Sequence, residues 1–142
     1  MDSTTIKREK CCGCIIIKDN KVLLIKQTQG HWGFPKGHVE DNETEIETAI
    51  REVKEETNLD VEIVDANKRY TMEYETDTGA IKQVVFFSAK YIGGKIKAQE
   101  CEVSNIQWLN FEEALKTITY DNTKELFKKY LKEEKYVYSG NI

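Results

Sequence analysis

The stretch ETEIETAIREVKEET, residues 43–57, constrains the fold more than any other part of the sequence. Its apolar residues recur at the i, i+3, i+4, i+7 spacing of a helix with one buried face, and such a helix needs a second layer to cover it. Asp41 or Asn42 is predicted to cap the start of the helix, and Asn58 to end it in a left-handed conformation. Glu43 is expected to act as a helix-terminus acid. The predicted buried positions are Ile46, Ala49, Ile50 and Val53.

Three carboxylates crowd one side of this helix, because Glu52 precedes Glu55 and Glu56 by three and four residues. Like charges at these spacings destabilise an isolated helix by about 0.2–0.5 kcal/mol per pair. The three acids fall beside the apolar stripe, at the border between core and solvent. Their hard oxygen atoms suit Mg²⁺ or Mn²⁺, and bound cations would relieve the repulsion. A solvated acidic surface is the alternative that these residues alone leave open.

The rest of the chain mixes strand and helix patterns. The loop at 28–43 holds the only proline and separates an expected β-hairpin from the acidic helix. Such a mixture predicts an α/β (α+β layered) domain. Strands are expected at 11–18, 22–27, 60–75, 80–92 and 104–110, and helices at 111–118 and 123–134.

Length and charge exclude several classes of protein. A chain of 142 residues with 39% hydrophobic residues suits one domain spanning 1–142. The net charge of −4 argues against a protein that binds nucleic-acid backbones. No apolar run approaches the length of a membrane span, and the polar start lacks a secretory signal. A cytoplasmic protein that does not contact membranes is therefore expected.

The cysteines allow two interpretations. CCGC at residues 11–14, with Cys101, could contribute to a zinc site, but the second cysteine pair of most structural zinc sites is missing. The favoured interpretation is that Cys11, Cys12 and Cys14 are small strand residues in a reducing compartment.

The acidic helix lies within a longer pattern. From Gly37 to Leu59 the sequence resembles the Nudix box, G-x₅-E-x₇-R-E-U-x-E-E-x-G-U with U an aliphatic residue, and every defined position matches except the last glycine, here Asn58. Asn tolerates positive φ, so the departure is compatible with the pattern. The resemblance implies a single Nudix domain over 1–142 with its box at 37–59. It further implies an α/β/α sandwich with a mixed β-sheet, a loop–helix–loop box, and metal-dependent hydrolysis of a nucleoside diphosphate linked to another moiety.

The same resemblance assigns roles to the box residues. Glu52, Glu55 and Glu56 are implied ligands of Mg²⁺, with Mn²⁺ as a possible substitute, and Glu56 or Glu52 is a candidate general base. Arg51 is expected to orient Glu52 or its neighbours through a charge-assisted bond. Glu102, in a later loop, is a further candidate ligand, with an ordinary surface acid as the alternative.

The stretch WGFPKGHVE, residues 32–40, resembles the asymmetric diadenosine tetraphosphate hydrolase branch of the family. That resemblance places Lys36 and His38 against polyphosphate oxygens, and Lys82, in IKQVVFF, against phosphate. Tyr74 and Tyr120 are candidates for stacking on adenine, and each could equally be a core or rim tyrosine. The implied reaction converts diadenosine tetraphosphate and water to ATP and AMP.

Other functions stay open within the same pattern. A nucleoside triphosphate pyrophosphohydrolase or an RNA 5′-pyrophosphohydrolase would use the same chemistry, although the acidic net charge disfavours an RNA partner. A non-catalytic nucleotide sensor is the alternative outside enzymes, and the intact box acids argue against it. The expected partner is a small nucleoside polyphosphate, nucleic acid is not expected, and the protein is expected to be a monomer.

Overall fold

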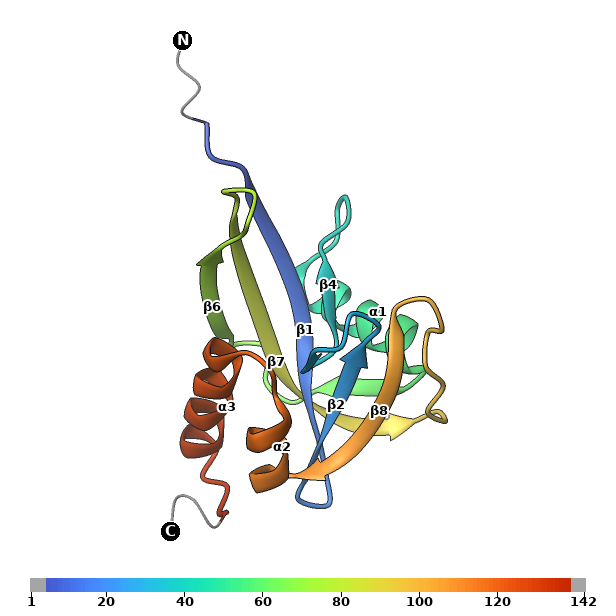
Figure 1. Cartoon of the computed structure of the whole chain (residues 1–142). Helices are drawn as coiled ribbons and strands as arrows, with labels where there is room; N and C mark the ends of the chain where they lie inside the picture. Colours follow the sequence, from blue (N-terminus) through green and yellow to red (C-terminus); the bar gives the residue numbers. More distant parts are fainter. Residues whose placement is uncertain (1–4, 139–142) are drawn as a thin grey trace.

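The computed structural model describes residues 5–138, which form a mixed eight-stranded sheet between helices (Figure 1). The central strands β1 (Arg8–Lys18) and β7 (Ile81–Gly93) run parallel to each other. The layered α/β architecture is confirmed. The other strands, all antiparallel to their partners, are β2 (Lys21–Gln27), β3 (Trp32–Gly33), β4 (Lys36–His38), β5 (Asp60–Ile63), β6 (Tyr70–Glu75) and β8 (Val103–Asn110). The helices are α1 (Glu45–Thr57), α2 (Phe111–Thr117) and α3 (Asp121–Glu133).

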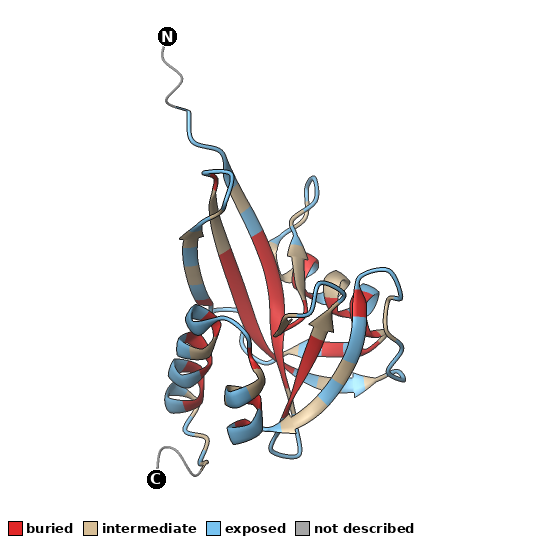
Figure 2. Ribbon diagram, in the orientation of Figure 1, coloured by how far each residue is buried: buried red, intermediate tan, exposed pale blue. Residues whose placement is uncertain are grey.

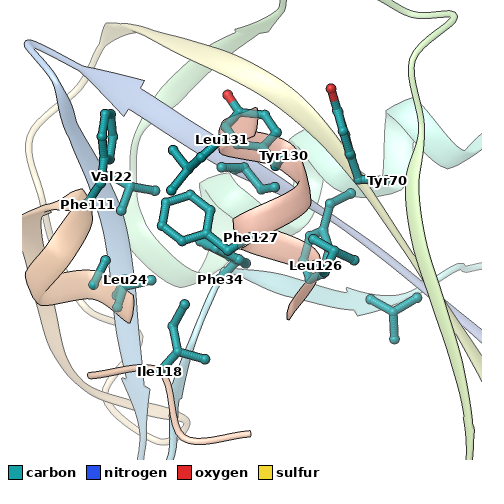
Figure 3. Close-up of a cluster of buried hydrophobic side chains, with 14 of the residues drawn as sticks. Val22, Leu24, Phe34, Tyr70, Phe111, Ile118, Leu126, Phe127, Tyr130 and Leu131 are labelled. Carbon is teal, nitrogen blue, oxygen red and sulfur yellow. The ribbon is translucent and has the colours of Figure 1, made fainter. Parts of the chain in front are cut away.

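β1 is buried on both faces because its alternate side chains enter two cores. Cys11 packs in the core with residues of α2 and α3, whereas Cys12 and Cys14 pack in the core with α1. These three cysteines are thus free, buried strand residues, as expected, whereas Cys101 is free and exposed. Figure 2 shows the buried band along β1 and β7. Labelled members of the first core in Figure 3 are Val22, Leu24, Phe34, Tyr70, Phe111, Ile118, Leu126, Phe127, Tyr130 and Leu131.

The predicted β-hairpin is present. β1 and β2 pair antiparallel with Lys18 opposite Lys21. The two residues between them, Asp19 and Asn20, have φ values of 51° and 60°. Tight hairpin turns of this kind need two left-handed residues, and Asp and Asn adopt that conformation more readily than most residues.

The start of α1 differs from the prediction. Thr44, and neither Asp41 nor Asn42, is the N-cap: its hydroxyl accepts from the Glu47 amide at 3.1 Å, and the Glu47 side chain accepts from the Thr44 amide at 2.8 Å. This capping box fits Thr followed three residues later by Glu. Asn42 instead takes a left-handed turn conformation, with φ of 67°, in the preceding loop.

The buried face of α1 is also rotated from its predicted position. Ala49 and Val53 are fully buried, but Ile50 is 38% exposed. The buried face instead includes Thr48, Glu56 and Thr57, and Ile50 therefore falls at its border.

Two further expectations were too coarse. The stretch 28–43 contains β3 and β4 and is not wholly a loop, and 60–75 is two strands, β5 and β6, separated by a turn. Strands of two to four residues are too short to show a period in the sequence. Among the helices in the described residues, none combines the length and apolarity needed to cross a bilayer.

Candidate active site

The guanidinium of Arg51 joins α1 to the loop before it. Its Nε and Nη2 donate to the two carboxylate oxygens of Glu43 at 2.6 and 3.0 Å. Its Nη1 donates to Glu52 at 2.9 Å and to Glu55 at 2.8 Å, so the expected charge-assisted contact with Glu52 is present. Nη2 also donates to the His38 carbonyl at 3.0 Å. The forked bond from Arg51 lowers the pKa of Glu43 to about 2, which keeps that carboxylate ionised.

Glu56 is a buried carboxyl group, 3% exposed, on the side of α1 that faces the sheet. One of its oxygens accepts from the backbone amide of Lys36 at 3.2 Å. Burial raises the pKa of Glu56 far above its usual value, and the charge of Glu52 raises it further. Burial also raises the pKa of Glu52. Two ionised carboxylates here are therefore unfavourable unless a cation compensates them.

An acidic cavity of about 560 Å³ opens beside α1. It is lined by all three clustered carboxylates and by Glu102 from the segment between β7 and β8. The cavity thus brings together the four acids that the sequence nominated. Its other lining residues include Gln27, His31, Lys36, His38, Lys82 and Gln99.

An aromatic cavity of about 540 Å³ lies on the other side of the two lysines. Both nominated tyrosines line it: Tyr74 from β6 and Tyr120 from the turn before α3. Tyr120 is 53% exposed, which makes it a rim residue and leaves its ring available to a ligand. Lining residues shared with the acidic cavity are Gln27, His31, Lys36 and Lys82, so the two cavities adjoin.

The two lysines reach this junction from different strands. Lys36 begins β4, and Lys82 lies near the start of β7, where it pairs with Tyr74 across the strands. Burial lowers the pKa of Lys36, and the neighbouring charge of Lys82 lowers it further. Two cations close together at this point would attract an anion of high charge density.

His38 lines the acidic cavity, but its ring is already engaged. Its Nε2 lies 3.0 Å from a carboxylate oxygen of Glu9, on the neighbouring strand β1. That contact lowers the pKa of Glu9. A phosphate at His38 would therefore compete with Glu9.

The segment that carries Tyr120 is tied to β3. The Trp32 amide donates to the Thr119 hydroxyl at 2.8 Å, and the Thr119 amide donates to the Trp32 carbonyl at 3.1 Å. This pair of bonds places the Tyr120 ring 5.4 Å from the ring of His31, centre to centre.

Known proteins resemble this chain in sequence and in fold. Residues 7–130 match the NUDIX domain family. The chain belongs to the Nudix hydrolase family. It is 34% identical over 102 residues to the asymmetrical bis(5′-nucleosyl)-tetraphosphatase of Caenorhabditis elegans, covering 70% of this chain and 73% of that protein. The crystal structure of a C. elegans Ap4A hydrolase binary complex matches with a TM-score of 0.78 at 29% identity, over 89% of this chain and 98% of that one.

Other Nudix relatives are longer. Nudix hydrolase 2 of Arabidopsis thaliana is 34% identical over 110 residues, which cover 71% of this chain. The matched parts make up 38% of the length of that protein and 39% of the length of a Mycobacterium tuberculosis relative, MutT4.

The Nudix box at 37–59 forms β4, a loop, α1 and the turn after it. Gly37 at its start lies directly against the Glu52 carboxylate: a Cβ added at this position would fall 2.1 Å from Glu52 Cδ. Asn58, at the position where the family pattern has glycine, has φ of 66° and ends α1 as predicted. Glu43 does more than the helix-terminus role predicted for it, since it is the principal partner of Arg51.

The Nudix family implies a divalent metal ion. Within residues 5–138, no group of three or more Asp, Glu, His or Cys side chains is arranged so that it could hold a metal ion. Arg51 contacts both Glu52 and Glu55. The donors nevertheless fit such an ion: they are hard carboxylate oxygens around one cavity, and burial disfavours the ionised form of Glu56, which a cation would favour.

The sequence interpretation missed several residues that line the site, among them Gln27, His31 and Gln99. All three line the acidic cavity, and the first two also line the aromatic one. His31 could have been predicted most easily, because it is one of two histidines and lies in the loop before the Nudix box. Gln27 and Gln99 belong to no recognisable pattern.

Proposed function

We propose that this Nudix hydrolase cleaves diadenosine tetraphosphate with water to give ATP and AMP in the presence of Mg²⁺. The observation that carries the proposal is the junction at Lys36 and Lys82, which line both the acidic and the aromatic cavity. A substrate with a base at one end and a polyphosphate chain beyond it would fill both. The C. elegans relative, a bis(5′-nucleosyl)-tetraphosphatase, supports the same substrate class.

The metal ion would be held by Glu52, Glu55 and Glu56, with Glu102 completing the set from the segment between β7 and β8. When bound, Mg²⁺, or Mn²⁺ in its place, supplies a Lewis acid that draws charge from the phosphoryl oxygens. Glu55 has to give up its bond to Arg51 to take part, whereas Glu43 can keep the guanidinium in place.

The chain's own residues supply the proton transfer. Glu56 or Glu52 accepts a proton from the attacking water, since both carboxyl groups line the acidic cavity. The water oxygen forms a bond to an end phosphorus, and the bond from that phosphorus to the bridging oxygen breaks. The bridging oxygen leaves with ATP, while Lys36 and Lys82 bind the phosphate oxygens.

The adenine would lie in the aromatic cavity. Tyr74 and Tyr120 present rings there, and His31 lies beside Tyr120. Stacking on such rings contributes about 1–3 kcal/mol per base. His38 contacts the polyphosphate only if it leaves Glu9, so we give it a smaller share of the binding than the two lysines.

The alternatives share this site. A nucleoside triphosphate pyrophosphohydrolase would use the same acids and lysines, and an RNA 5′-pyrophosphohydrolase would need a basic path for the chain that a net charge of −4 does not favour. A nucleotide sensor would bind without turnover. We also expect residues 1–142 to act as one domain, monomeric and cytoplasmic.

A substrate panel tests the proposal. Purified protein with Mg²⁺ is given diadenosine tetraphosphate, ATP, an oxidised nucleoside triphosphate or a 5′-triphosphorylated RNA at matched concentrations, and kcat/KM is measured for each. The proposal expects the dinucleotide to have the highest value, with Glu56→Gln inactive on all. A preference for a nucleoside triphosphate would contradict the substrate, and nucleotide binding without turnover would contradict the enzyme.

A further inference from the structure

The segment between β7 and β8, residues 94–102 and here named the β7–β8 loop, forms one wall of the acidic cavity. It contributes Gln99 and Glu102 to that wall. Its far end is held by the Thr28 amide, which donates to the Glu102 carbonyl at 2.9 Å. The Glu102 amide also donates to the Gln99 carbonyl at 3.0 Å, so the position of Glu102 relative to the helix acids depends in part on what holds Gln99.

The loop lies across the C-terminal end of α1. The Lys97 amide donates to the Thr57 carbonyl at 3.0 Å, and the Gln99 amide donates to the Glu56 carbonyl at 3.4 Å. The last carbonyl groups of a helix have no partner within the helix, and here the loop supplies two of the missing donors. The loop thus contacts the backbone of Glu56 while its side chains face the same cavity.

Asn58 makes the side-chain contact between helix and loop. Its Nδ2 donates to the Lys95 carbonyl at 3.0 Å. The backbones also approach closely, because a Cβ at Gly94 would lie 2.6 Å from the Asn58 carbonyl oxygen. The Tyr91 hydroxyl, donating to the Gly94 carbonyl at 2.7 Å, holds the start of the loop.

A glycine at position 58 would supply the left-handed conformation without this bond. Asn58 has φ of 66°, which glycine adopts without steric cost. The amide side chain is therefore not needed to end the helix. What the Asn58 side chain adds is the hydrogen bond from its Nδ2 to the Lys95 carbonyl in the loop.

We propose that Asn58 is a positioning residue, whose amide holds the β7–β8 loop on α1 so that Glu102 stays at the acidic cavity. The inference rests on the proposed function in one respect, the role of Glu102 as a metal ligand. Asn58 itself touches neither metal nor substrate and acts through the loop.

The first test is hydrogen exchange in Asn58→Gly, measured on the full chain without metal. Losing one hydrogen bond of this kind is expected to speed exchange of the Lys97 and Gln99 amides by about three- to tenfold. Asn20→Gly is the matched control, because Asn20 also has positive φ, 60°, but lies in the β1–β2 turn. Unfolding midpoints of both variants, measured alongside, separate local from global opening.

The second test is Mn²⁺ affinity by calorimetry in a double-mutant cycle. Asn58→Gly is expected to weaken Mn²⁺ binding by about three- to tenfold. In a Glu102→Gln background the same change is expected to have no further effect, because the two residues act through one loop.

Several outcomes overturn the inference. Exchange at Lys97 and Gln99 equal to that of Asn20→Gly would show that Asn58 does not hold the loop. Faster exchange with unchanged Mn²⁺ affinity, or an equal loss of affinity in both backgrounds, would show that the loop does not act through Glu102. If the wild-type protein fails to hydrolyse diadenosine tetraphosphate while both tests give the expected results, the substrate assignment fails and this inference stands.

Discussion

The carboxylate of Glu52 lies against the backbone of Gly37, so close that a Cβ on Gly37 would fall 2.1 Å from Glu52 Cδ and 2.3 Å from both of its oxygens. Gly37 opens the Nudix box and Glu52 lies in the middle of its helix. This contact explains why the pattern has glycine fifteen residues before Glu52. The Glu52 carboxylate occupies the space that a side chain at position 37 would need.

Gly37→Ala is expected to displace the Glu52 carboxylate and weaken Mg²⁺-dependent turnover. Misplacing a metal ligand or its support typically costs roughly 10- to 100-fold in affinity or activity, and we expect kcat/KM to fall by that amount. The measurement is a Mg²⁺ titration of activity. Gly93→Ala is the control, since its Cβ would meet only Asp60 at an ordinary 3.6 Å. Equal activity in the two variants would contradict the account.

Glu43→Gln is expected to release one side of Arg51. The guanidinium loses its shortest ionic contact, 2.6 Å, and is then free to hold Glu52 and Glu55 more tightly, in competition with a metal ion. We expect roughly tenfold weaker Mg²⁺ activation, measured from the Mg²⁺ dependence of kcat. Glu62→Gln, which removes a partner of the exposed Lys90, should leave activation unchanged. Unchanged Mg²⁺ activation in Glu43→Gln would show that the Glu43 carboxylate is not needed to hold Arg51 in place.

Glu56→Gln is expected to stabilise the metal-free protein while abolishing turnover. Burial raises the pKa of Glu56 in the folded protein above its value in the unfolded chain. The contribution of Glu56 to the free energy of unfolding is therefore fully present below its pKa in the unfolded chain, about 4.3. That contribution is lost as pH rises through the pKa of Glu56 in the folded protein. Glutamine at position 56 does not ionise, so the variant does not lose stability in this way as pH rises. Because a pKa change of one unit corresponds to about 1.4 kcal/mol, we expect the variant to gain at least that much at about pH 8.

Urea unfolding with a chelator, from about pH 5 to about pH 8, checks this expectation. The difference in free energy of unfolding between Glu56→Gln and wild type should grow with pH in favour of the variant. A difference that is constant with pH, or that favours wild type at pH 8, would show that the Glu56 carboxylate is not penalised by burial.

Tyr120→Leu is expected to weaken substrate binding with little effect on the chemical step. Removing one stacking partner of the base costs about 1–3 kcal/mol, so KM for diadenosine tetraphosphate should rise by roughly 5- to 150-fold. Inorganic tripolyphosphate, which has no base, provides the matched comparison: its inhibition constant should not change. A similar rise for both ligands would mean that Tyr120 supports the fold of the site and not the base.

Local patterns in the sequence predicted that the acidic side chains of α1 lie close together. Glu52, Glu55 and Glu56 lie within one helix, so their spacing alone places them on one side of it. The left-handed conformation of Asn58 was also predictable locally, because Asn tolerates positive φ. Thr44 could have been identified as the N-cap from the Glu47 that follows it, because the pair has the capping-box spacing.

Relationships between distant segments were harder to predict. The junction of the two cavities depends on β4 and β7 lying on opposite sides of β1. The family resemblance assigned Lys36 and Lys82 to phosphate, but no local pattern in the sequence shows that the two residues meet. Ile50 carried the apolar pattern of a buried residue, yet it is 38% exposed, whereas Glu56 on the same helix is buried. The engagement of His38 by Glu9 likewise follows from the β1–β4 pairing.

The most direct test of the central claim is hydrolysis of diadenosine tetraphosphate with Mg²⁺ in ¹⁸O-labelled water, followed by mass spectrometry of the products. The account predicts ATP and AMP in equal amounts, with the label in AMP because water attacks the end phosphorus, and no products when Mg²⁺ is chelated. Two molecules of ADP, label in ATP, or no turnover would contradict it.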